Sequence, residues 1–174
     1  SEYSAYAIAG AGEHASFLTQ VRGSDGVGSL GRINMMTGAT TLRIPRFDLQ
    51  TFSADGARAY VRVRDKAAKT GVLTVTDLAT QQTREVWRSP ELFAVTDRND
   101  ISPDGTLVAF WLRTGPKLQS AMLKVANITS NEVKTLKTIE ERVGGTQVVF
   151  SPDGNRLYFS TYASNGDDST LWSI

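Results

Sequence analysis

Cysteine is absent from this sequence of 174 residues, and histidine occurs once. The absence of cysteine excludes disulfides, iron–sulfur clusters, thiolate zinc sites and a cysteine nucleophile. A single histidine excludes every site that needs two, such as the H-E-x-x-H zinc motif. The G-x-S-x-G nucleophile elbow of serine hydrolases is missing too. We therefore expect no catalytic residues and no cofactor in this sequence.

An excess of one charge and long apolar runs are also missing. The 19 Lys and Arg residues stand against 18 Asp and Glu, which argues against a nucleic-acid partner because nucleic-acid-binding domains are usually basic. No stretch approaches the roughly 20 apolar residues of a membrane helix, so we expect no membrane insertion. The first residues, Ser1–Tyr3, carry neither the charged nor the apolar region of a signal peptide, so none is expected in this sequence.

A repeat organises the residues that are present. Three segments that align without gaps are Phe52–Val61, Ile101–Phe110 and Phe150–Phe159. Their shared glycine recurs at intervals of 49 residues, at Gly56, Gly105 and Gly154. A fixed period of this size is the signature of a repeat architecture.

Each copy is built around a tight turn of the Ser-Pro-Asp-Gly type, with Ala54 in place of the proline in the first of the three. Proline presets the backbone for the second turn position, aspartate suits the third, and glycine takes the left-handed position that follows. The residues predicted to form these structural turns are Asp55, Gly56, Pro103, Asp104, Gly105, Pro152, Asp153 and Gly154. Because the turn itself requires the three aspartates, we expect no catalytic role for them.

Short apolar runs rich in β-branched and aromatic residues surround these turns and indicate strands. A second, weaker repeat occupies the other half of each unit: Gly31–Gly38, Thr74–Thr80 and Lys124–Ser130 each place Asp or Asn and a Thr/Ser turn before another such run. Each unit is therefore predicted to hold four strands.

An up-and-down unit of four strands with a period of about 40–50 residues is a propeller blade. The F-S-P-D-G-x-x-L-x-F pattern of Phe150–Phe159 is similar to the TolB-type, WD-like propeller repeat of bacterial proteins. The resemblance covers nearly the whole chain and implies an all-β fold, a β-propeller of four-stranded blades. This repeat marks a fold and occurs with many functions.

The period divides the sequence into blades at approximately 1–45, 46–95, 96–145 and 146–174. In the first blade Gly10 and Ala11 replace the Pro-Asp of the turn, and the last blade has room for only three strands. We therefore predict a single partial β-propeller of about 3.75 blades, an incomplete set from a larger propeller. The alternative is a complete chain that closes imperfectly or by association with another chain.

Within a propeller, the loops between strands 2 and 3 and between successive blades lie at one end of the sheets, and they vary here in length and composition. Variable loops on a rigid scaffold usually carry recognition. The candidate partner-binding residues at this end are Arg62, Arg64, Lys66, Trp87, Phe93, Arg98, Arg113, Arg142 and Tyr162. Asp167 and Asp168 offer oxygen ligands for calcium but lack the spaced Asp pattern and distal Glu of a calcium loop, so we expect no metal.

The sequence thus favours a non-catalytic binding or scaffolding module whose partner is a protein or peptide. A second expected partner is the rest of the same propeller, or another chain, which would complete the open blade. The alternative is the substrate-gating propeller of a prolyl-oligopeptidase-like serine peptidase, or of another propeller hydrolase or lyase, with its catalytic residues outside this chain. The family resemblance implies a periplasmic or extracellular location in a bacterial cell envelope.

Overall fold

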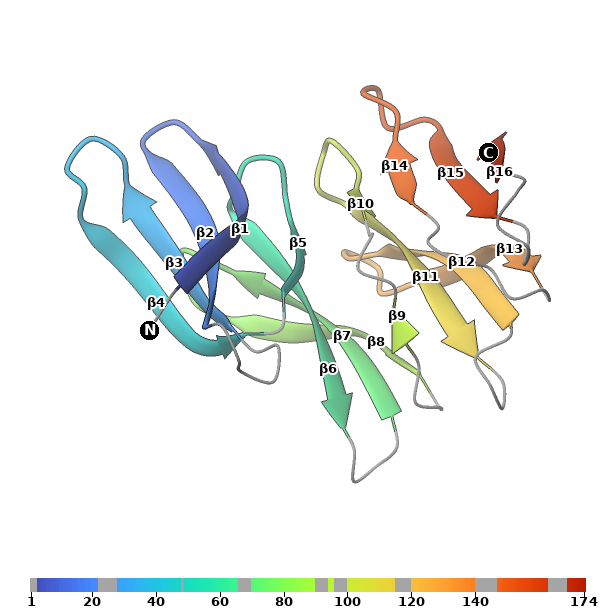
Figure 1. Ribbon diagram of the computed structural model, residues 1–174, viewed down its shortest axis with the longest axis horizontal. Coiled ribbons are helices and arrows are strands. Elements are labelled where there is room, and N and C mark those ends of the chain that lie inside the picture. The colour runs from blue at the N-terminus through green and yellow to red at the C-terminus, as the bar shows by residue number, and fades with distance from the viewer. Residues whose placement is uncertain are drawn as a thin grey trace. The chain divides into compact units, whose positions relative to one another are not determined.

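The structure is a computed structural model, and it describes residues 3–21, 28–47, 49–65, 70–89, 94–95, 100–114, 120–139, 147–162 and 169–174. All regular secondary structure in these residues is β-strand (Figure 1). The all-β prediction is therefore confirmed. The described part of the chain holds no helix long and apolar enough to cross a membrane.

The chain forms two compact units, one of Ser1–Val63 with Thr74–Arg84 and the other of Arg64–Leu73 with Glu85–Ile174. The first unit contains an antiparallel sheet in the order β1 (Tyr3–Ala11), β2 (His14–Val21), β3 (Gly28–Asn34) and β4 (Thr40–Phe47). This is the predicted first blade. Its irregular turn still forms, since Ala11 pairs with His14 and Gly12 adopts a φ of 65°.

The second sheet has the same up-and-down order: β5 (Leu49–Phe52), β6 (Arg58–Asp65), β7 (Thr70–Asp77) and β8 (Thr83–Ser89). The boundary between the two units falls within β6, β7 and β8. The residues of this sheet nearest the loops, in 64–65, 70–73 and 85–89, therefore belong to the second unit.

The third sheet runs β10 (Asp100–Ile101), β11 (Leu107–Thr114), β12 (Ser120–Asn127) and β13 (Val133–Ile139). The short strand β9 (Ala94–Val95) also pairs with β11, at Leu112 and Arg113, although the sequence pattern assigned residues 94–95 to the preceding blade. The fourth sheet has three strands, β14 (Val148–Phe150), β15 (Leu157–Tyr162) and β16 (Ser169–Ser173), as the sequence predicted.

Adjacent sheets of the second unit meet through a common core. Ala109, Trp111, Ala121 and Leu123 of the third sheet are buried together with Val148, Leu157 and Phe159 of the fourth. The Trp111 and Phe159 rings meet edge to face, with centroids 5.6 Å apart and planes inclined at 72°, a favoured aromatic geometry. Burying side chains of this size contributes about 1.5–3 kcal/mol each, so the contact between the two sheets is a major source of stability in this unit.

Candidate functional site

Each sheet has two ends that differ in chemistry. We call the end with the strand 1–2 and 3–4 connections the turn end, and the end with the strand 2–3 and inter-blade connections the loop end. At the turn end, the Oγ atoms of Ser53, Ser102 and Ser151 donate to the Oδ1 atoms of Asp55, Asp104 and Asp153, each at 2.5 Å. The same Oδ1 atoms accept the backbone N–H groups of Ala57, Thr106 and Asn155, at 2.9, 3.0 and 3.1 Å.

These hydrogen bonds stabilise the ionised carboxylates. The serine hydroxyl contributes most to lowering the pKa of each aspartate, followed by the backbone N–H. The φ angles of the shared glycines are 64°, 69° and 73° at Gly56, Gly105 and Gly154, a conformation in which a Cβ is unfavourable. The turns therefore hold the aspartates in the structural role that the sequence assigned to them.

The strand 3–4 connections form a second repeated motif at the turn end. In each, one side-chain oxygen accepts the N–H groups of the residues two and three positions on. These oxygens belong to Asn34, Asp77 and Asn127, and their donors lie at 2.8–3.0 Å. The fourth residue after each is in the left-handed region: Gly38, Gln81 and Asn131, with φ of 70°, 60° and 60°. Most polar groups in these turns therefore form hydrogen bonds within the turn itself.

The predicted partner residues fall into three groups. Lys66, Phe93, Arg98 and Arg142 lie outside the described residues, as do the calcium candidates Asp167 and Asp168. For a second group the structure places the backbone in a strand: Arg62 and Arg64 in β6, Arg113 in β11 and Tyr162 in β15. Only Trp87 has a described side chain. Arg64, Arg113 and Tyr162 are at or next to the loop-end residue of their strands.

Trp87 is half-buried and contacts the third sheet. Its ring centroid lies 5.5 Å from that of Phe110, and Lys124 Nζ lies 5.7 Å from the centre of the Trp87 ring. Burial lowers the pKa of Lys124, while Lys124 Nζ donates to Thr135 Oγ1 at 2.7 Å. Trp87 therefore stabilises the contact between sheets and leaves only part of its ring available to a partner.

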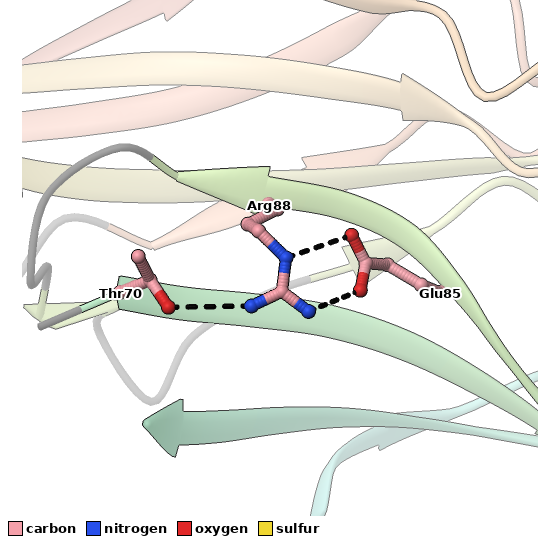
Figure 2. Close-up of polar contacts among 3 residues, drawn as sticks. All are labelled: Thr70, Glu85 and Arg88. Carbon is pink, nitrogen blue, oxygen red and sulfur yellow. Dashed lines mark hydrogen bonds and ion pairs between the residues drawn. The ribbon is translucent and has the colours of Figure 1, made fainter. Parts of the chain in front are cut away.

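The structure adds a loop-end group that the sequence did not single out (Figure 2). Arg88 Nε donates to Glu85 Oε1 at 3.1 Å, Nη2 donates to Glu85 Oε2 at 2.5 Å, and Nη1 donates to Thr70 Oγ1 at 3.3 Å. The Arg88 and Glu85 side chains are 48% and 44% exposed. The guanidinium is therefore held in one orientation at the surface, although an exposed pair of this kind adds little stability, about 0–1 kcal/mol.

A pocket of about 370 Å³ lies at the turn end of the second unit, between the third and fourth sheets. Its apolar lining consists of Leu107, Val125, Leu136, Phe150, Leu157 and Ile174. Its polar lining includes Glu132 and Lys134, which form an ion pair at 3.4 Å, and Arg156. This lining is suited to binding and contains no histidine or serine to act as base or nucleophile. Among the described residues, no group of His, Asp and Glu is arranged to hold a metal ion.

No protein-family model matches the sequence, and no curated protein matches it. Several solved structures match the fold. TolB from Acinetobacter baumannii superposes with a TM-score of 0.65 at 14% identity, over 98% of this chain and 41% of TolB. The β-propeller domain of the Trilobed protease from Pyrococcus furiosus gives 0.65 at 10% identity, over 98% and 54%. Pyrococcus horikoshii acylaminoacyl peptidase gives 0.69 at 11% identity, over 98% and 31%.

This chain therefore spans between 31% and 54% of the length of these three structures. At such low identity the likeness establishes the fold and carries no information about activity. Three observations indicate the same fold: the sheets of antiparallel strands, the turns repeated every 49 residues, and the likeness to these solved structures. The chain has the fold of a β-propeller, and the TolB-type resemblance read from its sequence is confirmed at the level of the fold.

Proposed function

We propose that this chain is a non-catalytic binding and scaffolding module that presents the loop end of its blades to a protein or peptide partner. The observation that carries the proposal is the difference between the two ends. At the turn end, the same Ser–Asp hydrogen bond recurs in the turns of the second, third and fourth blades, so these polar groups are paired within the turns themselves. The loop end varies in sequence, which suits recognition on a rigid scaffold.

The best-defined anchor at the loop end is Arg88. Glu85 and Thr70 hold its guanidinium in place while nearly half of the side chain remains exposed. A fixed orientation lowers the conformational entropy that a partner must remove on binding. Arginine is also among the residues that most often dominate binding energy at interfaces. Arg64, at the same end of the second sheet, is the second anchor of the proposed surface.

The proposal can be tested by selecting peptides from a random display library on the immobilised chain and then measuring their affinity for variants. We expect Arg88→Ala to raise the dissociation constant about tenfold, equivalent to ~1.4 kcal/mol, because it removes one anchor. The matched control is Lys134→Ala, which removes an exposed cation at the turn-end pocket and should leave affinity unchanged. Affinity lost in Lys134→Ala and kept in Arg88→Ala would place binding at the pocket and contradict the proposal.

A second candidate is the substrate-gating propeller of a serine peptidase. It is favoured by the presence of acylaminoacyl peptidases and prolyl endopeptidases among the similar structures. The gene sequence beyond the codon for Ile174 distinguishes the two functions. A G-x-S-x-G motif followed by Asp and His supports the peptidase, whereas further blades or a cell-wall-binding domain support the scaffold.

By analogy with TolB, we also propose a periplasmic or extracellular location. Fractionation of the source cells tests this separately from binding. Recovery of the protein with cytoplasmic markers would contradict the proposed location and leave the binding proposal intact.

A further inference from the structure

Lys124, in β12, has surroundings unlike those of the other lysines that the structure describes. Lys134 forms an ion pair with Glu132 at 3.4 Å, and its side chain is 69% exposed. Lys137 places its Nζ 4.6 Å from the centre of the Trp172 ring. Lys124 is partly buried, and no carboxylate in the described part of the chain forms an ion pair with it. Its charge is therefore not balanced by a described neighbour.

The face of the third sheet that carries Lys124 is apolar around it. Strand pairing places Phe110 of β11 and Thr135 of β13 directly opposite Lys124. Residues two positions apart on a strand point to the same face, and the next neighbours on this face are Val108, Leu112, Met122, Ala126 and Val133. Lys137 is not one of them, because the register shifts before it and it pairs with Leu123. Lys124 is thus the charged member of an otherwise uncharged face.

Two contacts hold the end of the Lys124 side chain. Its Nζ donates to Thr135 Oγ1 at 2.7 Å and lies 5.7 Å from the centre of the Trp87 ring of β8. The charged residues of β8 in the same unit, Glu85 and Arg88, pair with each other. Burial lowers the pKa of Lys124, because the ammonium loses hydration that one neutral acceptor and an aromatic ring do not replace.

We propose that Lys124 is a site of covalent acylation by a small activated acyl donor. Acylation requires the neutral amine, because its lone pair is the nucleophile, and uncharged surroundings favour that form of a lysine. The side chain is only partly buried, so a small donor reaches its end. A bulky donor is hindered by the Trp87 ring beside the amine.

The reaction converts the amine into an amide. The lone pair of Lys124 Nζ attacks the carbonyl carbon of the donor, and a C–N bond forms. The bond from that carbon to the leaving group breaks, the leaving group departs with its electron pair, and the amine proton passes to solvent. The amide is neutral and keeps one N–H that can donate to Thr135 Oγ1. Acylation therefore removes the charge that burial opposes and retains a donor for the existing hydrogen bond.

Acetyl phosphate is the probe, and it is applied to the folded chain at low conversion, from neutral pH up to 10.5, the ordinary pKa of a lysine. Mass spectrometry after chymotryptic digestion gives the initial rate of acetylation at each lysine. At neutral pH we expect Lys124 to react at least about threefold faster than Lys134. The ratio of the two rates should fall as the pH approaches 10.5, because both side chains are then largely neutral.

A variant with a new carboxylate tests the physical cause. Thr135→Glu places a carboxylate directly opposite Lys124, which favours the ammonium and should slow acetylation of Lys124 at neutral pH by about threefold. The matched control, Thr129→Glu, adds the same charge in the turn between β12 and β13 and should leave the rate unchanged. Both positions are exposed, so both variants should fold.

Acetylation of Lys124 at or below the rate of Lys134 would overturn the proposal, because it would show that burial shields the amine from the donor. A rate ratio that does not change with pH, or an unchanged rate in Thr135→Glu, would overturn it as well. The rates are measured on the chain without any peptide. The outcome is therefore independent of whether the loop end binds a partner.

Discussion

Lys137 is expected to stabilise the second unit through the ring of Trp172. Its Nζ lies 4.6 Å from the centre of that ring. Trp172 in turn stacks on Phe159, at 6.3 Å and 11°, and Phe159 contacts Trp111. Because the Trp172 ring is partly exposed, the cation–π interaction should contribute about 0.5–1 kcal/mol. We therefore expect Lys137→Met, which keeps the apolar stem, to lower the free energy of unfolding by that amount.

Lys124 and Trp87 form a second lysine–tryptophan pair, with which the Lys137–Trp172 pair can be compared. In the two pairs, lysine and tryptophan occupy exchanged positions of the repeat. Trp87 and Lys137 hold the same position in β8 and β13, and Lys124 and Trp172 hold the same position in β12 and β16. Lys124 Nζ lies 5.7 Å from the centre of the Trp87 ring, close to the limit of about 6 Å for this interaction. Burial also opposes its charge and lowers its pKa. Lys124→Met should therefore cost less than Lys137→Met, below about 0.5 kcal/mol.

Urea unfolding followed by tryptophan fluorescence is a suitable assay. The three tryptophans of the sequence, Trp87, Trp111 and Trp172, all belong to the second unit and so report its unfolding. A double-mutant cycle of Lys137→Met and Trp172→Leu should give a coupling of about 0.5–1 kcal/mol. A coupling near zero, or a larger loss for Lys124→Met than for Lys137→Met, would refute this reasoning.

Four other predictions concern individual residues. Gln81→Gly should stabilise the first unit by about 0.5–1 kcal/mol, because the left-handed backbone at φ 60° disfavours a Cβ. Gly31→Ala should destabilise it by about 1–3 kcal/mol, because the added Cβ would lie 2.4–2.9 Å from Phe17 ring atoms. Asp100→Asn should stabilise the second unit at neutral pH, because burial raises the pKa of Asp100. This gain should disappear as the pH falls through the raised pKa of the folded state to below 3.8, the ordinary pKa of an aspartate, because the wild-type carboxyl is then neutral in both the folded and the unfolded state. Asp104→Asn should show the opposite sign, because hydrogen bonds lower the pKa of Asp104. Its carboxylate stabilises the fold above pH 3.8, and that stability is lost as the pH falls through the folded pKa.

Calorimetry or circular dichroism must follow the Gln81 and Gly31 variants, because the first unit contains no tryptophan. Gln82→Gly is the control for Gln81→Gly, since Gln82 is not among the residues with positive φ, and it should destabilise. Phe17→Leu should partly rescue Gly31→Ala by opening space for the added methyl group. Equal effects of Gln81→Gly and Gln82→Gly, or no rescue by Phe17→Leu, would contradict the respective explanations.

Local chemistry explains why so much of the fold could be predicted. The turn around Asp104 is specified by four consecutive residues, so its position and the strands beside it follow directly from the sequence. The turn of the first blade departs from this pattern, with Gly10 and Ala11 in place of Pro-Asp, yet Gly12 still adopts the left-handed backbone of the other turn glycines. The two-residue strand β9 carries no such pattern, and its pairing with β11 depends on the tertiary structure.

The candidate site was less predictable because it depends on contacts between strands and sheets. Glu85 and Arg88 are three residues apart, a spacing that in a regular strand points side chains to opposite faces, so their ion pair could not be anticipated. Trp87 was predicted as a partner contact, but the structure also shows it packed on Phe110. That contact joins strands far apart in the sequence, which single-residue patterns do not encode.

Hydrogen–deuterium exchange of the chain, with and without a peptide selected on it, tests the proposed partner surface most directly. The account predicts that the peptide slows exchange at the loop-end residues 64–65, 88–89 and 113–114, and that the turns at 102–107 and 151–156 are unaffected. Slowed exchange confined to those turns, or to the pocket residues 132–136, would contradict it.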